Sequence, residues 1–505
     1  MSKILKSAVA LSASAVAGYA FTHNPLGPAV AAAAMGLVLH AKYSGDGSKD
    51  RQFGDTVRGT IVDSKTKRKG RAPADQIAIG GIPIPRDSEP QHVLVVGATG
   101  AGKSVTCTGI MDVARARHQR AIVYDGTGEY VSYYYRPDRD VILSPIDARS
   151  ALWSPWAEGT TAFSYGRLAR ALIPEGQGEN AFWAQAGRAV FRAALASTTD
   201  LAALIALVFA EDQEFLLAVL QASGLAGLAG PPQMLASTRG VCATYIQPLA
   251  YLPTPGSTPF SIREWVRTEN NDSWLFIVSR EDVREEIRPL MSMWIGLAVQ
   301  SAMSLPADRE RRLWMILDEL PYLQELPSLE TLLSGGRKYG LAAILGMQSI
   351  AQLRKIYGPD GAVALLSNPA TRLTLKVGDH ETADFLSKSL GDRHTIRKVQ
   401  SESQNPGGDG QSTSDQHAIE AAVLPSEILS LPDLTGYLRV PGDPIIKKIR
   451  LIRRERTVVA EPYQDRDLDT LPSIPKAPAP SFAGAPVPGV VLNVPDLDGP
   501  DLPDL

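Results

Sequence analysis

A glycine-rich segment places a lysine and a serine where phosphates could bind. It reads Gly97-Ala98-Thr99-Gly100-Ala101-Gly102-Lys103-Ser104 and is followed by Val105. Glycines let the backbone N–H groups wrap around phosphates, while the lysine reaches the β and γ phosphates and the serine hydroxyl binds Mg²⁺. Residues 97–105 are therefore predicted to bind ATP, with Lys103 acting in catalysis and Ser104 as a ligand of Mg²⁺.

Two acidic residues and an amide complete the predicted chemistry. Asp318 and Glu319 follow the apolar run Leu313–Leu317, and Gln348 follows the apolar run Ala342–Met347. Asp318 is expected to hold Mg²⁺ through its water shell, and Glu319 to orient or deprotonate the attacking water. Gln348 could hydrogen-bond both that water and the γ-phosphate. An Asp-Glu pair alone could be a solvated strand end, but the phosphate-binding loop favours catalysis.

These side chains need strand ends and a helix start to position them. His92–Val96 predicts a buried parallel strand that leads into the loop, and Val105–Arg117 has helical composition. Further strands are predicted at Ala121–Asp125, Trp274–Val278 and Arg372–Val377. Alternating strands and helices predict an α/β fold with a parallel central sheet.

A long helical stretch interrupts this alternation. Ala162–Leu252 is dominated by Ala, Leu, Arg and Gln with helical periodicity, which predicts an inserted all-α subdomain at 155–260. The nucleotide-binding domain would then consist of residues 91–154 and 261–456. Ser401–Gln416 contains no large apolar residue, and we expect it to form a surface loop.

The N-terminal region is apolar. Ser7–Ala41 contains no Lys, Arg, Asp or Glu and is broken by the turn signal His23–Pro28. Basic residues flank both sides, which predicts a transmembrane hairpin at 1–45 with both ends in the cytoplasm. A cleaved signal peptide, a single span and a soluble helix pair remain alternatives.

Basic residues are clustered at two places. Lys49–Arg71, in the juxtamembrane segment 46–90, holds eight Lys and Arg against three Asp. Anionic lipid headgroups compete with DNA there, and lipid is slightly favoured. Lys447–Arg456 is equally consistent with a solvated face and a phosphate track. Phe53 is the single aromatic residue in the two clusters, so there is no interleaved aromatic series for base stacking, which favours sequence-independent binding of the DNA backbone.

The C-terminal region, 457–505, has ten prolines and eight acidic residues against two basic ones. This composition predicts a disordered acidic tail, which is either a plain linker or a docking segment for a basic partner.

Composition limits the possible classes of protein. With 505 residues the chain should form more than one domain, and its formal charge of −3 excludes a generally basic nucleic-acid coat. Cys107 and Cys242 are the only cysteines in the sequence, which excludes a disulfide scaffold and a cysteine-based zinc site.

The ordered set of motifs resembles type IV secretion coupling proteins of the TraD/TrwB class, which are RecA-like ATPases related to FtsK and HerA. The resemblance covers about residues 90–455. Besides the loop at 97–104, it rests on these segments: Asp125–Glu129, Leu143–Arg149 with Trp153 and Trp156, Leu317–Pro321, Gly336–Gly340, Gln348–Leu353 and Gly436–Leu438.

The resemblance implies an ATPase of the bacterial inner membrane, with most of the chain in the cytoplasm. It implies ATP hydrolysis coupled to transfer of relaxase-bound single-stranded DNA through a type IV secretion channel in conjugation. The partners implied are DNA, the relaxase and relaxosome, and the channel proteins. The predicted hairpin is shorter than is usual for this family, which puts periplasmic contacts in doubt.

The resemblance also implies a homo-hexamer with ATP between subunits. Such rings usually take an arginine from the neighbouring subunit to stabilise charge at the γ-phosphate. Arg337 is the first candidate by position and Arg372 the second; the alternative for Arg337 is pairing with a surface carboxylate.

Two other functions remain open. One is a DNA pump of the FtsK/HerA type that takes no part in secretion, although basic DNA-reading modules would be expected after the motor and this tail is acidic. The other is an ATP-gated membrane receptor that recruits protein substrates. Stimulation of ATP hydrolysis by DNA would separate this receptor from both motors.

Overall fold

A computed structural model of the protein describes the chain in segments. They are residues 55–63, 73, 75–176, 178–209, 213–222, 224, 227, 232–253, 258–268, 271–405 and 408–467. By their internal contacts these residues form two compact units, the larger within Gly59–Arg393 and Ala421–Leu505, the smaller within Met1–Arg58 and His394–Glu420. The expected membrane hairpin at 1–45, most of the basic cluster Lys49–Arg71 and the tail beyond 467 lie outside the described residues.

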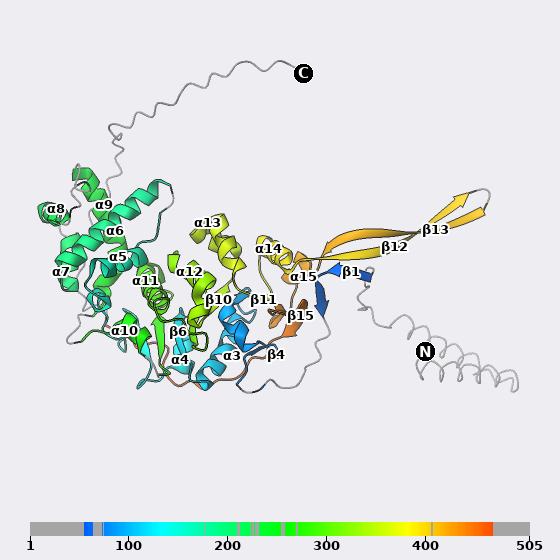
Figure 1. Ribbon diagram of the computed structural model, residues 1–505, viewed down its shortest axis with the longest axis horizontal. Coiled ribbons are helices and arrows are strands. Elements are labelled where there is room, and N and C mark those ends of the chain that lie inside the picture. Colours follow the sequence, from blue (N-terminus) through cyan, green and yellow to red (C-terminus); the bar gives the residue numbers. More distant parts are fainter. Residues whose placement is uncertain are drawn as a thin grey trace, which may run out of the picture. The chain divides into compact units, whose positions relative to one another are not determined.

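The larger unit is built on a ten-stranded sheet in the order β2-β15-β14-β11-β5-β10-β9-β6-β8-β7 (Figure 1). Seven neighbouring strands run parallel. They are β11 (Thr371–Leu375), β5 (Val93–Val96), β10 (Leu341–Met347), β9 (Leu313–Leu317), β6 (Arg120–Asp125), β8 (Trp274–Val278) and β7 (Val141–Leu143).

One side of the sheet departs from the parallel arrangement. β14 (Thr435–Arg439) is antiparallel to β11, β15 (Ile445–Arg450) is antiparallel to β14, and β2 (Ile61–Asp63) is parallel to β15. The predicted α/β fold is therefore confirmed, with a sheet that is mixed and mostly parallel.

The central strands are buried on both faces, and their side chains alternate between two cores. Leu94 and Val96 of β5 belong to one core, whereas Val93 and Val95 belong to the other. This alternation follows from the two-residue period of a strand. Because both faces of these strands are buried, their side chains are mostly apolar, and uninterrupted apolar runs therefore predicted them as strands.

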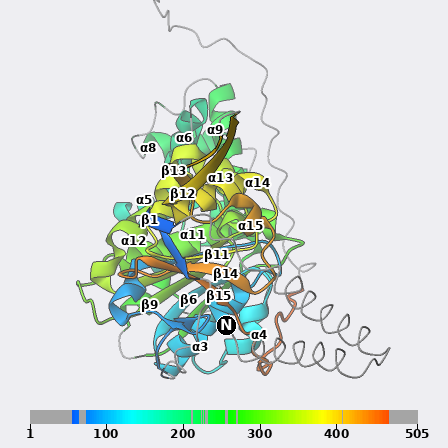
Figure 2. The ribbon, with the colours of Figure 1, turned by 90° about the vertical axis from the view of Figure 1, so that its right-hand side faces the viewer.

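Helices cover both faces of the sheet (Figure 2). On one side lie α3 (Lys103–Ala116) and α4 (Glu129–Tyr134). On the other lie α11 (Arg284–Ala302), α12 (Pro327–Gly335), α13 (Ile350–Ser367) and α14 (His380–Leu390). The sheet is thus the middle layer of three, as expected for a parallel sheet with crossover helices.

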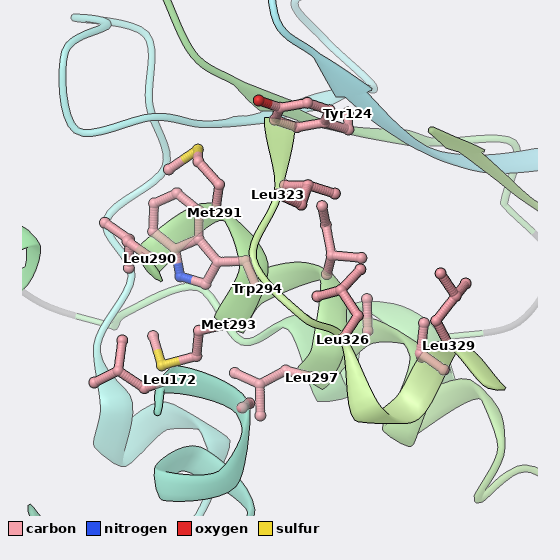
Figure 3. Close-up of a cluster of buried hydrophobic side chains, with 14 of the residues drawn as sticks. Tyr124, Leu172, Leu290, Met291, Met293, Trp294, Leu297, Leu323, Leu326 and Leu329 are labelled. Atoms are coloured by element: carbon pink, nitrogen blue, oxygen red, sulfur yellow. The ribbon is translucent and has the colours of Figure 1, made fainter. Parts of the chain in front are cut away.

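A further helical layer follows β7. Its helices are α5 (Ala162–Leu172), α6 (Glu179–Ser197), α7 (Leu201–Phe209), α8 (Gln213–Ala222), α9 (Pro232–Ile246) and α10 (Ile262–Arg267). Figure 3 shows Leu172 of α5 close to Met293 and Leu297 of α11, with Trp294 of α11 lying between them and Tyr124 of β6. The helical layer therefore shares one continuous core with the sheet.

A separate three-stranded sheet has the order β1-β12-β13. It consists of β1 (Asp55–Gly59), β12 (Asp392–Asn405) and β13 (Gly408–Ala421). The prediction of a surface loop at Ser401–Gln416 is wrong, because most of this segment lies in the two long strands. The ladder of a sheet uses backbone groups, so a strand pair can form without the apolar side chains on which the prediction depended.

The segment 451–467, which we call the C-terminal strap, is extended and attached to the larger unit. Val459 N–H donates to Ser132 O at 2.8 Å, and Ala148 N–H donates to Gln464 O at 2.8 Å. The predicted start of the disordered tail at 457 is therefore wrong. Composition alone missed these contacts because they are made with residues more than 300 positions away.

Candidate nucleotide-binding site

The phosphate-binding loop lies between β5 and α3, as its sequence predicted. Gly97 N–H donates to Met347 O and Ala98 N–H donates to Lys376 O, which ties the loop to the ends of β10 and β11. Gly102 has φ +120, and a Cβ there would lie 2.8 Å from the Leu451 side chain. Only glycine combines this backbone conformation with so close a neighbour.

Lys103 is buried and reaches across its own loop. Its Nζ donates to Gly97 O at 2.9 Å and lies 3.5 Å from Glu319 Oε2. The lysine charge thus sits between the loop and the acidic end of β9, where phosphate groups could replace the Gly97 carbonyl as its partner.

Ser104 and Asp318 come together, as predicted for a magnesium site. Ser104 Oγ donates to Asp318 Oδ2 at 2.9 Å, although the two residues are 214 positions apart. Both offer the hard oxygen atoms that Mg²⁺ prefers, and the serine stands at the start of α3 beside the phosphate-binding loop. Donor chemistry and placement fit a metal ion held partly through its waters.

Glu319 and Gln348 also meet. Gln348 Nε2 donates to Glu319 Oε2 at 2.9 Å, while Thr99 Oγ1 donates to Gln348 Oε1 at 3.1 Å. Burial raises the pKa of Glu319 and Lys103 opposes this effect. Among the described residues Glu319 Oε1 is buried without a hydrogen-bond partner, so this oxygen is available to a water molecule.

Two neighbours of Asp318 were missed by the sequence analysis. Tyr130 OH donates to Asp318 Oδ2 at 2.5 Å, and Cys107 Sγ lies 3.5 Å from Asp318 Oδ1. Burial and the Asp318 charge raise the pKa of both groups well above their usual values. The available signal was that Tyr130 directly follows the Asp125–Glu129 motif.

Glu129 is a third group that the sequence analysis assigned no role. Burial raises the pKa of Glu129, and the Asp318 carboxylate raises it further. Arg453 and Arg456 of the C-terminal strap oppose this effect. The strap therefore brings part of the basic cluster Lys447–Arg456 towards the nucleotide site, while Arg456 itself pairs with Asp112 at 2.7 Å.

The two candidate arginines lie elsewhere. Arg337 is exposed in the short 3₁₀ helix Gly336–Tyr339, which precedes β10. Arg372 stands near the start of β11, where its guanidinium donates to Ser367 O and Pro369 O. The phosphate-binding loop follows the other end of these parallel strands, so neither arginine lies in the nucleotide site of its own chain.

The fold and site together define a P-loop nucleotide-binding protein with a mostly parallel α/β sheet. Residues 76–451 match the family described as the type IV secretion-system coupling protein DNA-binding domain. The chain belongs to the family of type IV secretion-system coupling proteins, which confirms the resemblance found from the motifs.

Similar proteins agree with this assignment. The coupling protein TraD of Escherichia coli strain K12 is 35% identical over 407 residues, which make up 78% of this chain and 57% of TraD. Protein VirD4 of Agrobacterium fabrum strain C58 is 30% identical over 179 residues, or 35% of this chain and 26% of VirD4. The chain thus spans little more than half of TraD.

A solved structure of similar fold contains nucleotide. The plasmid coupling protein TrwB in complex with ADP and Mg²⁺ has a TM-score of 0.73 and 32% sequence identity to this protein. The match covers 82% of this chain and 98% of the TrwB chain. The RecA-like P-loop fold expected from the motifs is therefore shared with TrwB.

Among the helices within the described residues, none combines the length and the apolar character that crossing a membrane requires.

Proposed function

We propose that this protein is a membrane-anchored ATPase that couples ATP hydrolysis to the transfer of DNA through a type IV secretion channel in conjugation. Membership of the coupling-protein family and similarity to TraD and VirD4 support the transfer role. The assembled nucleotide site supports the use of ATP and Mg²⁺, and the similar structure of TrwB is a complex with ADP and Mg²⁺.

The residues of the site have separate roles in this proposal. Mg²⁺, if bound, would offset the negative charge of the phosphates. Ser104 would hold it directly and Asp318 would hold it through water. Lys103 Nζ would exchange Gly97 O for the β and γ phosphate oxygens, a short movement because the lysine already lies across the loop.

The observation that carries the proposal is the group of side chains around Glu319. Gln348 occupies one carboxylate oxygen of Glu319, and the other is buried without a partner within the described chain. A water molecule that donates a hydrogen bond to this second oxygen would lie near the phosphate-binding loop, where Glu319 could orient it or take its proton. Gln348 also contacts Thr99, so it links the water-orienting group to the loop that holds the phosphates.

The partners and location belong to the same proposal. We expect a homo-hexamer at the bacterial inner membrane, anchored by the apolar segment Ser7–Ala41. A relaxase with its bound single strand would be the cargo, and the channel proteins would receive it. DNA contact would be sequence-independent, because the charge clusters suit phosphates rather than bases.

The test is ATP hydrolysis by the full chain, purified in detergent, with and without single- or double-stranded DNA. We expect DNA to stimulate hydrolysis several-fold and Lys103→Ala to abolish it, because the P-loop lysine contacts the phosphates directly. Hydrolysis that depends on Lys103 but ignores DNA, at low salt and at oligomer-forming concentrations, would overturn the DNA-transfer proposal in favour of a receptor for protein substrates.

A further inference from the structure

The carboxylate of Asp318 is held by more than the serine of the phosphate-binding loop. Oδ2 accepts hydrogen bonds from Ser104 Oγ at 2.9 Å and from Tyr130 OH at 2.5 Å. The thiol of Cys107 lies 3.5 Å from Oδ1. Tyr130 is 3% exposed and Cys107 is fully buried, so water does not compete for these positions.

Two donors on the same oxygen fix the rotation of the carboxylate plane. A serine hydroxyl that binds Mg²⁺ through its oxygen can keep its hydrogen bond to the carboxylate, because the proton and the lone pairs point in different directions. The Tyr130 phenol donates the second hydrogen bond that holds the Asp318 carboxylate in place. With both bonds made on Oδ2, Oδ1 accepts only the weak hydrogen bond of the Cys107 thiol and keeps a lone pair for water on the metal ion.

A buried turn determines where the phenol lies. The Asp125 carboxylate, fully buried at the end of β6, accepts hydrogen bonds from Val131 N at 2.9 Å and Thr127 N at 3.2 Å. Gly128 has φ +73 and is the N-cap residue that precedes α4. These contacts hold the first turn of α4 against the sheet, and Tyr130 projects from that turn towards β9.

We infer that Tyr130 is a positioning residue that orients the magnesium-holding carboxylate of Asp318, and that the Asp125–Glu129 turn serves to present its phenol. The inference rests on the proposed binding of ATP and Mg²⁺ at this site. It assigns a role to a motif that marks the family and otherwise takes no part in the chemistry described above.

The test measures binding rather than turnover. A fluorescent ADP analogue is titrated into the full-length protein in EDTA and then over a range of Mg²⁺ concentrations. Tyr130→Phe should weaken the apparent Mg²⁺ affinity about 10-fold or more, the usual cost of losing an outer-shell partner. Binding in EDTA should stay unchanged, because Lys103 and the loop amides remain.

Tyr134→Phe is the matched control. Tyr134 lies one turn later on α4, and its phenol donates to a different carboxylate, Asp112 Oδ1, at 2.5 Å. This variant loses an equally short hydrogen bond from the same helix, so we expect wild-type Mg²⁺ affinity. An equal loss in both variants would overturn the inference, because it would show a general effect of α4 packing.

Two further variants separate positioning from folding. In an Asp318→Asn background, Tyr130→Phe should cause no further loss of Mg²⁺ affinity, since the carboxylate that it orients is gone. If Tyr130→Phe does not fold, Asp125→Asn replaces it in the test. Asp125→Asn disturbs the turn but keeps the phenol, and it should also weaken Mg²⁺ binding.

The outcomes are distinguishable. Wild-type protein that binds no nucleotide would overturn the proposed function, and this inference with it. Wild-type protein that binds nucleotide with Mg²⁺, together with Tyr130→Phe of unchanged Mg²⁺ affinity, would overturn the inference alone.

Discussion

At the scale of single residues, the group around Glu319 is assembled from three places in the chain. Thr99 comes from the phosphate-binding loop, Glu319 from the end of β9 and Gln348 from the end of β10. β10 lies between β5 and β9 in the sheet, so the three ends are neighbours. The amide therefore lies between the loop and the acid because of the strand order.

Glu319→Gln tests the proposed role of the carboxylate. The amide keeps the size of the side chain but is a much weaker base, so we expect hydrolysis to fall about 100-fold or more. Nucleotide binding should persist because the loop is intact. The control is Glu330→Gln at an exposed position on α12. Hydrolysis by Glu319→Gln at the wild-type rate would contradict the assignment of Glu319.

His92 is a second residue with an unusual environment. It is 1% exposed, has φ +64 and accepts a hydrogen bond from Ala343 N at Nδ1, at 3.1 Å. Burial lowers the pKa of His92 to about 4, although hydrogen bonds to the main chain of Leu333 and Leu332 oppose this. A neutral imidazole is thus built into the start of β5.

The expected consequence is a pH-dependent stability. The unfolded chain binds a proton at His92 below pH about 6.5, whereas the folded chain resists protonation until about pH 4. Stability should therefore fall as pH drops through this window, by on the order of 3 kcal/mol from this residue. His92→Asn, which tolerates positive φ, should flatten the slope.

Urea unfolding at several pH values between 4 and 7.5 measures this slope. Burial raises the pKa of Asp125 to about 6, so Asp125 makes stability rise as pH falls, opposite to His92. This contribution is the same in wild type and in His92→Asn. His118→Asn controls for replacing a histidine in this conformation, since His118 is exposed and has φ +56. If the free energy of unfolding changed with pH equally in wild type and His92→Asn, His92 would not be a source of the pH dependence.

At the scale of elements, the C-terminal strap is the least expected feature. It is held through its backbone at α4 and through Arg456, whose Nη2 lies 2.7 Å from Asp112 Oδ2 on α3. Arg456 Nε also donates to Tyr134 OH. The strap therefore fastens the two helices that carry the nucleotide site.

Arg456→Ala should loosen the strap. We expect a loss of about 1–2 kcal/mol in unfolding free energy, because a charged hydrogen bond to a largely buried guanidinium is removed. Hydrogen exchange should increase over 452–467 and little elsewhere. Arg454→Ala is the matched control, since Arg454 is 3.9 Å from Asp112 with a 70% exposed side chain and should be nearly neutral. Equal effects in the two variants would show that the ion pair does not hold the strap.

At the scale of the whole molecule, the two ends of the parallel strands differ. The nucleotide site lies at the C-terminal ends of the strands, whereas Arg337 is exposed just before the N-terminal end of β10. An arginine at the N-terminal ends can reach a nucleotide only in another copy of the chain. A head-to-tail ring would bring the N-terminal ends of one subunit to the C-terminal ends of the next.

Mixing two inactive proteins tests this arrangement. Arg337→Ala should lower hydrolysis by about a thousandfold if it stabilises charge at the γ-phosphate. An equal mixture of Arg337→Ala and Lys103→Ala subunits should recover activity, because about a quarter of the interfaces in a random ring would hold both intact residues. Arg372→Ala is the comparison, since its guanidinium is occupied by backbone carbonyls. No recovery on mixing, with subunit exchange demonstrated, would exclude Arg337 as the arginine acting from a neighbour.

The sequence by itself determined the parts of this protein that depend on neighbouring residues. The phosphate-binding loop, its strand and its helix are consecutive, so their order alone identified the site around Lys103 and Ser104. Apolar runs of five to seven residues identified β8, β9 and β10 because buried parallel strands need no polar face. Asp318, Glu319 and Gln348 were found because they follow such runs.

Only the tertiary structure decided which of these groups meet. The order of strands in the sheet joined Gln348 to Glu319 and Thr99, and the fold of the Asp125 turn brought Tyr130 to Asp318. The same holds for the polar strands β12 and β13 and for the C-terminal strap, which composition had suggested to be a loop and part of a tail. β12 and β13 are neighbours in the chain that pair through their backbone and take β1 as a third strand. The strap is held by backbone hydrogen bonds and an ion pair to distant segments. Both depend on backbone geometry that local composition does not encode.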